Sequence, residues 1–126
     1  MARPPFEYAI AEYPLAPATY YQVGGPARWA LLPRTITDAA EAFQWLAGQP
    51  VPRLVLGRGS NVLIADAGFD GYVLLTEGLD RIEPLGGGRY VIEAGVELDR
   101  VVRSLILKHN YEGAGAFTGI PGSVGG

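Results

Sequence analysis

Two stretches of the chain repeat apolar residues at the spacing of an amphipathic helix. The first stripe, at i, i+3, i+4 and i+7, consists of Ala39, Ala42, Phe43 and Leu46. Thr35 precedes it as a candidate N-cap, and Asp38 follows three residues later, near the positive end of the helix dipole. Gly48 and Pro50 end the helix. Trp45 falls off the stripe, so we expect it to cover a flank of the core rather than to stack on a ligand.

The second stripe lies in the last third of the chain. It consists of Leu98, Val101, Val102 and Leu105. This pattern predicts a second helix, for which Asn110 is a plausible left-handed cap. Before it, the segments 81–83 and 89–94 flank a glycine-rich turn at 84–88, which predicts a β-hairpin.

Short apolar runs in the first two thirds of the chain predict strands. These runs are Tyr20–Val23, Arg28–Leu32, Arg53–Leu56, Val62–Ile64 and Tyr72–Thr76. With the helix after Thr35 they predict a compact α+β unit over residues 19–77, with a βαβ crossover at its centre. Residues 1–18 contain four prolines and are expected to form an extended arm. That arm would pack through Phe6, Tyr8, Tyr13 and Leu15.

We expect a second unit to begin near Gly78 and to occupy residues 78–126. One hairpin and one helix offer too little sheet to cover their apolar faces, so this unit is expected to be incomplete. The glycine-rich stretch 119–126, at which the sequence stops, supports the same expectation. We therefore interpret the 126 residues as the front part of a longer protein.

Composition excludes several classes of function. The formal net charge is -3, and no basic cluster indicates a nucleic-acid surface. The absence of cysteine excludes disulfides, thiol catalysis and cysteine-based metal sites. No signal peptide and no stretch of roughly 18 apolar residues is found, which favours a soluble, cytoplasmic protein without membrane contact.

Two further groups of polar residues are discounted as catalytic or metal sites. His109 falls near the end of the second helix, where a positive charge is favoured, and has no evident catalytic partner. Four acidic residues lack the spacing of a calcium loop and are expected to be solvated: Asp66, Asp70, Glu77 and Asp80. No metal site is therefore predicted.

Three glycine-rich loops remain as candidates for chemistry, at 24–26, 57–61 and 119–126. The middle loop fails the dinucleotide pattern G-x-G-x-x-G because Val62 stands where the third glycine is needed. No nucleoside-triphosphate loop is present either. Backbone N–H groups of 57–61 could instead form an anion-binding nest, and those of 119–126 a second one. Each loop could equally be a tight turn, and spacing alone does not show that the two meet.

The order of three motifs resembles the UDP-N-acetylenolpyruvoylglucosamine reductase family. The motifs are Val23-Gly24-Gly25-Pro26-Ala27, Leu56-Gly57-Arg58-Gly59-Ser60-Asn61-Val62-Leu63 and Gly119-Ile120-Pro121-Gly122-Ser123-Val124-Gly125-Gly126. The resemblance spans about residues 15–126. It implies an FAD-binding fold of the vanillyl-alcohol oxidase type, in which a small α+β subdomain precedes a subdomain with an antiparallel sheet and helix.

In that family the FAD pyrophosphate lies between the two subdomains. Carried over, one wall consists of Gly57, Arg58, Gly59, Ser60 and Asn61, and the other of Gly119, Ile120, Pro121, Gly122, Ser123, Gly125 and Gly126. The residue type at position 58 varies in the family, which leaves the role of Arg58 open. Gln22 stands where many relatives carry a basic residue.

The resemblance implies a monomeric cytoplasmic flavoenzyme of peptidoglycan precursor synthesis with non-covalent FAD. Such an enzyme uses NADPH to reduce UDP-N-acetylglucosamine enolpyruvate to UDP-N-acetylmuramate. Its catalytic serine, arginine and glutamate follow the third motif in the family's order, so none is assigned here and all are expected beyond Gly126. Two alternatives remain: another oxidoreductase of the same fold, or a flavin-free binding module that uses the glycine loops as turns.

Overall fold

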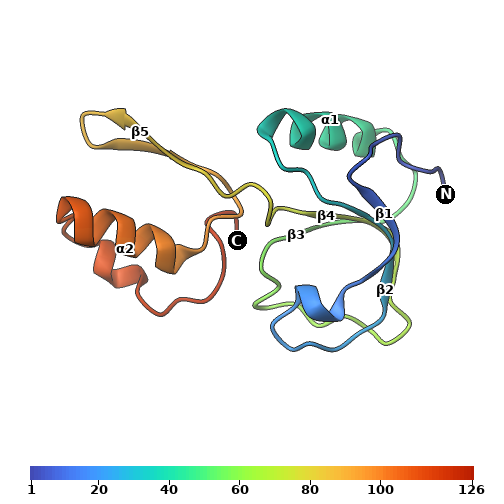
Figure 1. The fold of residues 1–126 in the computed structure, drawn as a ribbon. Helices are drawn as coiled ribbons and strands as arrows, with labels where there is room; N and C mark the ends of the chain where they lie inside the picture. The colour runs from blue at the N-terminus through green and yellow to red at the C-terminus, as the bar shows by residue number, and fades with distance from the viewer.

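The computed structural model describes residues 1–126, apart from the side chains of Ile106 and Leu107. The chain forms two lobes that lie side by side (Figure 1). We call residues 1–77 the sheet lobe and residues 78–126 the hairpin lobe. The end of the described chain lies between them, whereas the N-terminus lies on the far side of the sheet lobe.

The sheet lobe is built on a four-stranded sheet with the order β1-β2-β4-β3. The strands are β1 (Ala9–Pro14), β2 (Pro26–Leu31), β3 (Arg53–Leu56) and β4 (Phe69–Leu75). Strands β2 and β3 both run parallel to β4, and β1 is antiparallel to β2. Helix α1 (Ile36–Ala47) connects β2 to β3, one on each side of β4. The predicted βαβ crossover is therefore confirmed.

Helix α1 begins with the cap that the sequence predicts. The Thr35 hydroxyl accepts a hydrogen bond from the Asp38 backbone N–H at 3.1 Å, and the Asp38 carboxylate accepts one from the Thr35 N–H at 3.2 Å. This reciprocal capping box satisfies two N–H groups that have no partner within the helix.

The prediction of a buried stripe on α1 is wrong for one residue. Ala39, Ala42 and Leu46 are buried, but Phe43 is 47% exposed. The buried face is centred near Ala42, which leaves Phe43 on its outer edge and turns Trp45 inward at the opposite edge. The Trp45 ring lies against Tyr72 with a centroid distance of 5.0 Å, which confirms its predicted role as a flank of the core.

The core lies on both faces of the sheet because alternate residues of β4 point to opposite sides. Tyr72 and Leu74 join the cluster beneath α1, and Val73 and Leu75 join the cluster on the other face. All four are at most 3% exposed. Strand β4 is central and buried on both faces, which explains its continuous apolar run.

Two of the predicted strands are wrong, and the proline-rich arm contains a strand that was not predicted. Residues 20–23 and 62–64 form turns and loops, and neither pairs with a strand in the described chain. The residues that follow each segment meet instead: the Gly25 N–H donates to the Ala65 carbonyl at 2.9 Å. In the arm, β1 pairs with the edge of β2, so its backbone groups are satisfied by the sheet.

The hairpin lobe contains the predicted hairpin and helix. Strands β5 (Ile82–Gly86) and β6 (Arg89–Ile92) are antiparallel, and α2 (Leu98–His109) lies beside them, followed by a short 3-10 helix η2 (Ala114–Phe117) (Figure 1). Asn110 adopts φ 50°, the left-handed conformation that its predicted cap role requires. Among the described helices, none has the length and apolar character to cross a membrane.

Candidate cofactor-binding site

The loop 57–61 leaves the carboxyl end of β3, between the sheet and the hairpin lobe. Gly59 adopts φ +59°, and a Cβ there would lie 2.5 Å from the Ala18 carbonyl oxygen. The Gly59 carbonyl accepts a hydrogen bond from the Tyr20 N–H at 3.0 Å. Because open α/β sheets bind ligands beyond the carboxyl ends of their strands, this loop lies where a ligand is expected.

The loop 119–126 is held against the segment that precedes α2. The Leu98 N–H donates to the Gly122 carbonyl at 3.1 Å, the Val124 N–H to Val96 at 2.9 Å, and the Gly125 N–H to Ala94 at 2.8 Å. Ser123 forms a bridge with Glu97. These backbone bonds set the path of a loop that has few side chains to anchor it.

The two glycine-rich loops meet. A Cβ added to Gly57 would lie 2.6 Å from the Ser123 Oγ, and one added to Gly122 would lie 3.2 Å from the Ser60 Oγ. Ser123 is only 3% exposed, and its Oγ has no hydrogen-bond partner among the described residues. A side chain at Gly57 would displace the Ser123 hydroxyl, and one at Gly122 would press on the Ser60 hydroxyl, so the facing walls are backbone and serine hydroxyl.

An open cavity of about 450 Å³ lies over this contact. It is lined by Thr19, Tyr20, Gln22, Arg58, Ser60, Glu97, Asp99, Ile120, Pro121 and Gly122. The motif residues divide into three groups. Five of them line the cavity, and Gly57 and Ser123 meet behind it. The remaining motif residues, Gly59, Asn61, Gly119, Gly125 and Gly126, are not among the described lining.

Sequence reasoning missed four lining residues: Thr19, Tyr20, Glu97 and Asp99. Tyr20 was assigned to a strand, although its side chain is 73% exposed in a turn. Glu97 and Asp99 lie at the start of α2, and nothing in their spacing relates them to a loop around position 58. The sequence feature that could have identified Tyr20 is the pair of adjacent tyrosines just before the Gly-Gly-Pro turn.

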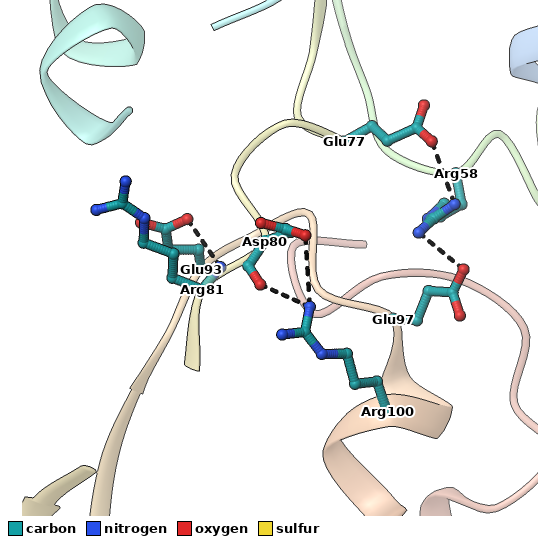
Figure 2. A network of polar contacts seen from close by, with 7 residues as sticks. All are labelled: Arg58, Glu77, Asp80, Arg81, Glu93, Glu97 and Arg100. Atoms are coloured by element: carbon teal, nitrogen blue, oxygen red, sulfur yellow. Dashed lines mark hydrogen bonds and ion pairs between the residues drawn. The ribbon is translucent and has the colours of Figure 1, made fainter. Parts of the chain in front are cut away.

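Arg58 is the one basic residue among those lining the cavity, and Figure 2 shows it between two carboxylates. One terminal nitrogen lies 3.3 Å from the Glu77 Oε1, and the other lies 2.7 Å from the Glu97 Oε1. The Arg58 Nε is buried without a hydrogen-bond partner in the described part of the chain. Nearby, Arg100 contacts Asp80, and the Glu93 carboxylate accepts a hydrogen bond from the Arg81 backbone (Figure 2).

His109 and the acidic residues lie outside this cavity. The His109 ring packs beside Tyr90, with a centroid distance of 5.5 Å, at the end of α2. In the residues that the structure describes, no three acidic or histidine side chains are grouped as a metal ion would require. The polar groups around the cavity are therefore backbone, hydroxyl, amide and paired charges.

The residues of the cavity fit the diphosphate of a dinucleotide. Glycine walls allow phosphate oxygens to approach backbone N–H groups, and the Ser60 hydroxyl on the cavity wall can donate to an anionic oxygen. The volume lies within the range of ligand pockets, about 300–1,000 Å³. The arrangement can bind and orient an anionic group. Among the described side chains at the cavity, no nucleophile is paired with a base.

Comparisons with known proteins relate the chain to flavoproteins. The sequence profile of the FAD binding domain family matches residues 27–126. UDP-N-acetylenolpyruvoylglucosamine reductase from Synechococcus sp. (strain JA-3-3Ab) is 39% identical over 92% of this chain and 37% of its own length. The protein of the same name from Phenylobacterium zucineum (strain HLK1) is 40% identical over 93% of this chain and 39% of its own length.

A solved structure agrees with the sequence relatives. The crystal structure of UDP-N-acetylenolpyruvylglucosamine reductase from Thermus caldophilus superposes with a TM-score of 0.69 at 28% identity, covering 94% of this chain and 39% of the other. The chain thus spans about two fifths of the relatives it matches. The expected α+β FAD-binding fold is confirmed. This chain belongs to the FAD binding domain family.

Proposed function

We propose that this chain supplies the FAD diphosphate-binding part of a UDP-N-acetylenolpyruvoylglucosamine reductase. The observation that carries the proposal is the contact of Gly57 with Ser123, which brings the two predicted phosphate loops to one cavity. The relatives, which are reductases of this kind, support the choice of this enzyme over other flavoproteins of the same fold.

In this proposal the chain's own residues bind and orient the cofactor. Backbone N–H groups of 57–61 and those of Gly119, Gly122 and Ser123, which the second loop leaves unbonded in the described chain, would hold the phosphate oxygens from two sides. The Ser60 hydroxyl would donate to the same oxygens. Bound FAD would supply hydride transfer from NADPH to the double bond of UDP-N-acetylglucosamine enolpyruvate. We assign no proton donor within the 126 residues, because the described cavity contains no acid–base pair.

The remaining features of the proposal concern the whole protein. FAD would be bound without a covalent bond, since His109 lies away from the cavity. NADPH and UDP-N-acetylglucosamine enolpyruvate would be its substrates, and UDP-N-acetylmuramate its product. We propose that this enzyme acts as a monomer in the cytoplasm, in the synthesis of peptidoglycan precursors.

The first test is made on the full-length protein. We expect it to purify with a visible flavin absorption spectrum, to release FAD on denaturation, and to oxidise NADPH only when UDP-N-acetylglucosamine enolpyruvate is present. A colourless protein that neither binds added FAD nor oxidises NADPH would contradict the proposal and favour a flavin-free binding module. A flavoprotein that oxidises NADPH with a different acceptor would favour another oxidoreductase of the same fold.

A variant at Gly122 tests the site itself. A side chain at Gly122 would enter the space between the two loops, where Ser60 Oγ lies 3.2 Å from the added Cβ. We expect Gly122→Val to abolish FAD binding. Gly59→Val is expected to do the same, but it would also press on the Ala18 carbonyl at 2.5 Å and disturb folding.

Gly87→Val is the matched control for Gly122→Val. Gly87 also has a positive φ, +59°, but a Cβ there meets nothing within 4 Å, and it lies in the hairpin turn away from the cavity. We expect this variant to keep its FAD affinity. Unchanged FAD affinity in Gly122→Val, measured by fluorescence titration of the refolded apoprotein, would refute the assigned site.

A further inference from the structure

Arg58 joins the two lobes through charge. It leaves the phosphate loop of the sheet lobe and reaches Glu97 in the hairpin lobe at 2.7 Å, while a second nitrogen contacts Glu77 at 3.3 Å (Figure 2). Among the residues whose side chains the structure describes, Arg58–Glu97 is the only ion pair between the lobes. The position of Arg58 therefore depends on both lobes at once.

The cavity presents an electrostatic problem for an anionic ligand. Two carboxylates, Glu97 and Asp99, line the same cavity as the phosphate loops. Each of them is paired with an arginine: Glu97 with Arg58 at 2.7 Å, and Asp99 with Arg103 at 2.6 Å. A carboxylate without its partner would repel a diphosphate across a short distance, because like charges in a shared cavity interact strongly.

The Arg58 guanidinium is held by two carboxylates. Each terminal nitrogen contacts one of them, Glu77 or Glu97, and the Nε is buried without a partner in the described chain. A bond from Arg58 to a phosphate that replaced its contact with Glu97 would have to break that ion pair. Breaking it would expose an unpaired carboxylate on the cavity wall at the moment when the anion binds.

We propose that Arg58 is a positioning residue that acts on the cofactor through Glu97. It neutralises the Glu97 carboxylate on the cavity wall and holds the two glycine-rich loops in register, and it makes no bond to the diphosphate. The inference rests on the proposed function, since it concerns the affinity for FAD. It differs from the motif resemblance, which places Arg58 in the wall that contacts the cofactor.

Substitutions at both partners distinguish the two roles. Arg58→Gln leaves Glu97 bare, and we expect FAD affinity to fall about five- to tenfold, in keeping with one unscreened charge contact. Adding Glu97→Gln removes the repelling carboxylate. We expect the double variant R58Q/E97Q to return to within about twofold of E97Q alone. If Arg58 binds the phosphate directly, the double variant would remain as weak as R58Q.

The measurement is a fluorescence titration of the full-length apoprotein with FAD at low and high salt. The effect of R58Q should shrink at high salt, because the Debye length falls to about 3 Å at 1 M. R100Q/D80N removes another ion pair of the same network, at 3.5 Å, whose residues do not line this cavity. We expect that control to change FAD affinity less than about twofold.

Each outcome decides between the hypotheses. A wild-type protein that binds no FAD overturns both the proposed function and this inference. Wild-type binding combined with an R58Q/E97Q variant as weak as R58Q overturns this inference alone. Should R58Q fail to fold, E97Q and R58Q/E97Q give the same answer. In the E97Q protein, a loss of FAD affinity beyond about twofold on adding R58Q would indicate that Arg58 contacts the diphosphate directly, and it would contradict the proposal.

Discussion

The sheet lobe and the hairpin lobe are held together in different ways. Among the side chains that the structure describes, which exclude those of Ile106 and Leu107, seven of the eight largest fully buried ones lie in the sheet lobe, and one, Val96, lies in the hairpin lobe. The sheet lobe is therefore stabilised by its own core. The hairpin lobe depends on its junction with the sheet lobe, where Gly95 packs so closely that a Cβ would lie 1.9 Å from the Thr76 carbonyl oxygen.

This difference shows how the chain builds its candidate site. The sheet lobe supplies a loop that follows directly from β3, whose last residue, Leu56, is buried in the core. The hairpin lobe supplies a loop held by backbone hydrogen bonds to residues 94–98. A cavity with one rigidly supported wall and one wall that depends on the junction should respond to changes at the junction as strongly as to changes in the loops.

The largest expected effect comes from the core of the sheet lobe. Leu74 is fully buried in β4, so Leu74→Ala should lower the free energy of unfolding by about 2–5 kcal/mol. Val102→Ala, in α2, should cost about 1–2 kcal/mol because it removes less apolar surface. Urea denaturation followed by circular dichroism measures both variants, because each lobe contains a helix, and tryptophan fluorescence separately reports on the sheet lobe, which contains both Trp29 and Trp45. Equal losses would contradict the comparison.

A methyl group at the junction should have the next largest effect. Gly95→Ala places a Cβ 1.9 Å from the Thr76 carbonyl oxygen and 2.7 Å from that of Leu79, so the lobes must move apart. We expect a loss of about 1–3 kcal/mol. FAD affinity should fall with it, since the two loops would separate.

Gly48→Ala is the control for the junction variant. Gly48 ends α1 at φ -85°, and an added Cβ there would have its nearest neighbour at an ordinary 3.6 Å. Stability and FAD affinity should both be unchanged. Loss of stability in Gly95→Ala without loss of FAD affinity would show that the site does not depend on the junction.

A smaller effect is expected at the start of α1. Thr35→Ala removes one half of the capping box and should cost about 0.5–2 kcal/mol without changing FAD affinity, because α1 lies away from the cavity. Thr37→Ala, at an exposed position two residues later, should be close to neutral. Thermal unfolding of the two variants, followed by circular dichroism, measures the difference. A loss of FAD affinity in Thr35→Ala would link α1 to the site.

The smallest effect concerns alkaline pH. Burial raises the pKa of Tyr72 above 10.0, against the opposing effect of its hydrogen bond to the Ala2 carbonyl; burial also raises that of Tyr8, with Asp38 and Glu41 adding to it. The folded state then holds its protons more tightly than the unfolded state. This contribution to stability is complete below pH 10.0 and is lost as pH rises beyond it.

Tyr72→Phe tests this pH dependence. The variant should be less stable at neutral pH by about 1 kcal/mol, because it loses the 2.7 Å hydrogen bond to Ala2. Its urea midpoint should also fall less steeply than that of the wild type above pH 10.0. Tyr20→Phe, at a 73% exposed position, is the control and should keep the wild-type slope. Parallel slopes for wild type and Tyr72→Phe would contradict the assignment.

Local sequence patterns predicted most of the fold where one physical cause decided the structure. The capping box at Thr35, the buried strand β4 and the left-handed Asn110 each follow from a few neighbouring residues. The segments 20–23 and 62–64 have the composition of strands but form turns and loops, and the neighbouring turn is held by contacts of Gly24 with Ile64 and of Gly25 with Ala65. Tertiary contacts overrode their intrinsic preference.

The candidate site was predictable in its loops and not in its walls. Glycine-rich motifs located the positions 57–61 and 119–126, because close approach of a backbone leaves a compositional trace. The pairing of Arg58 with Glu97 leaves none, since it joins residues of two lobes through long side chains. The contact between Gly57 and Ser123 likewise depends on how the lobes dock, which no local pattern encodes.

The contact between Gly57 and Ser123 also has a kinetic consequence. The two residues are far apart along the chain and belong to different lobes, so their encounter closes one of the longest loops in the described protein. The cavity should therefore be among the last features to assemble during folding. A cofactor that binds only the assembled cavity would shift the folding equilibrium toward the folded state. The flavin would then stabilise the fold as a ligand.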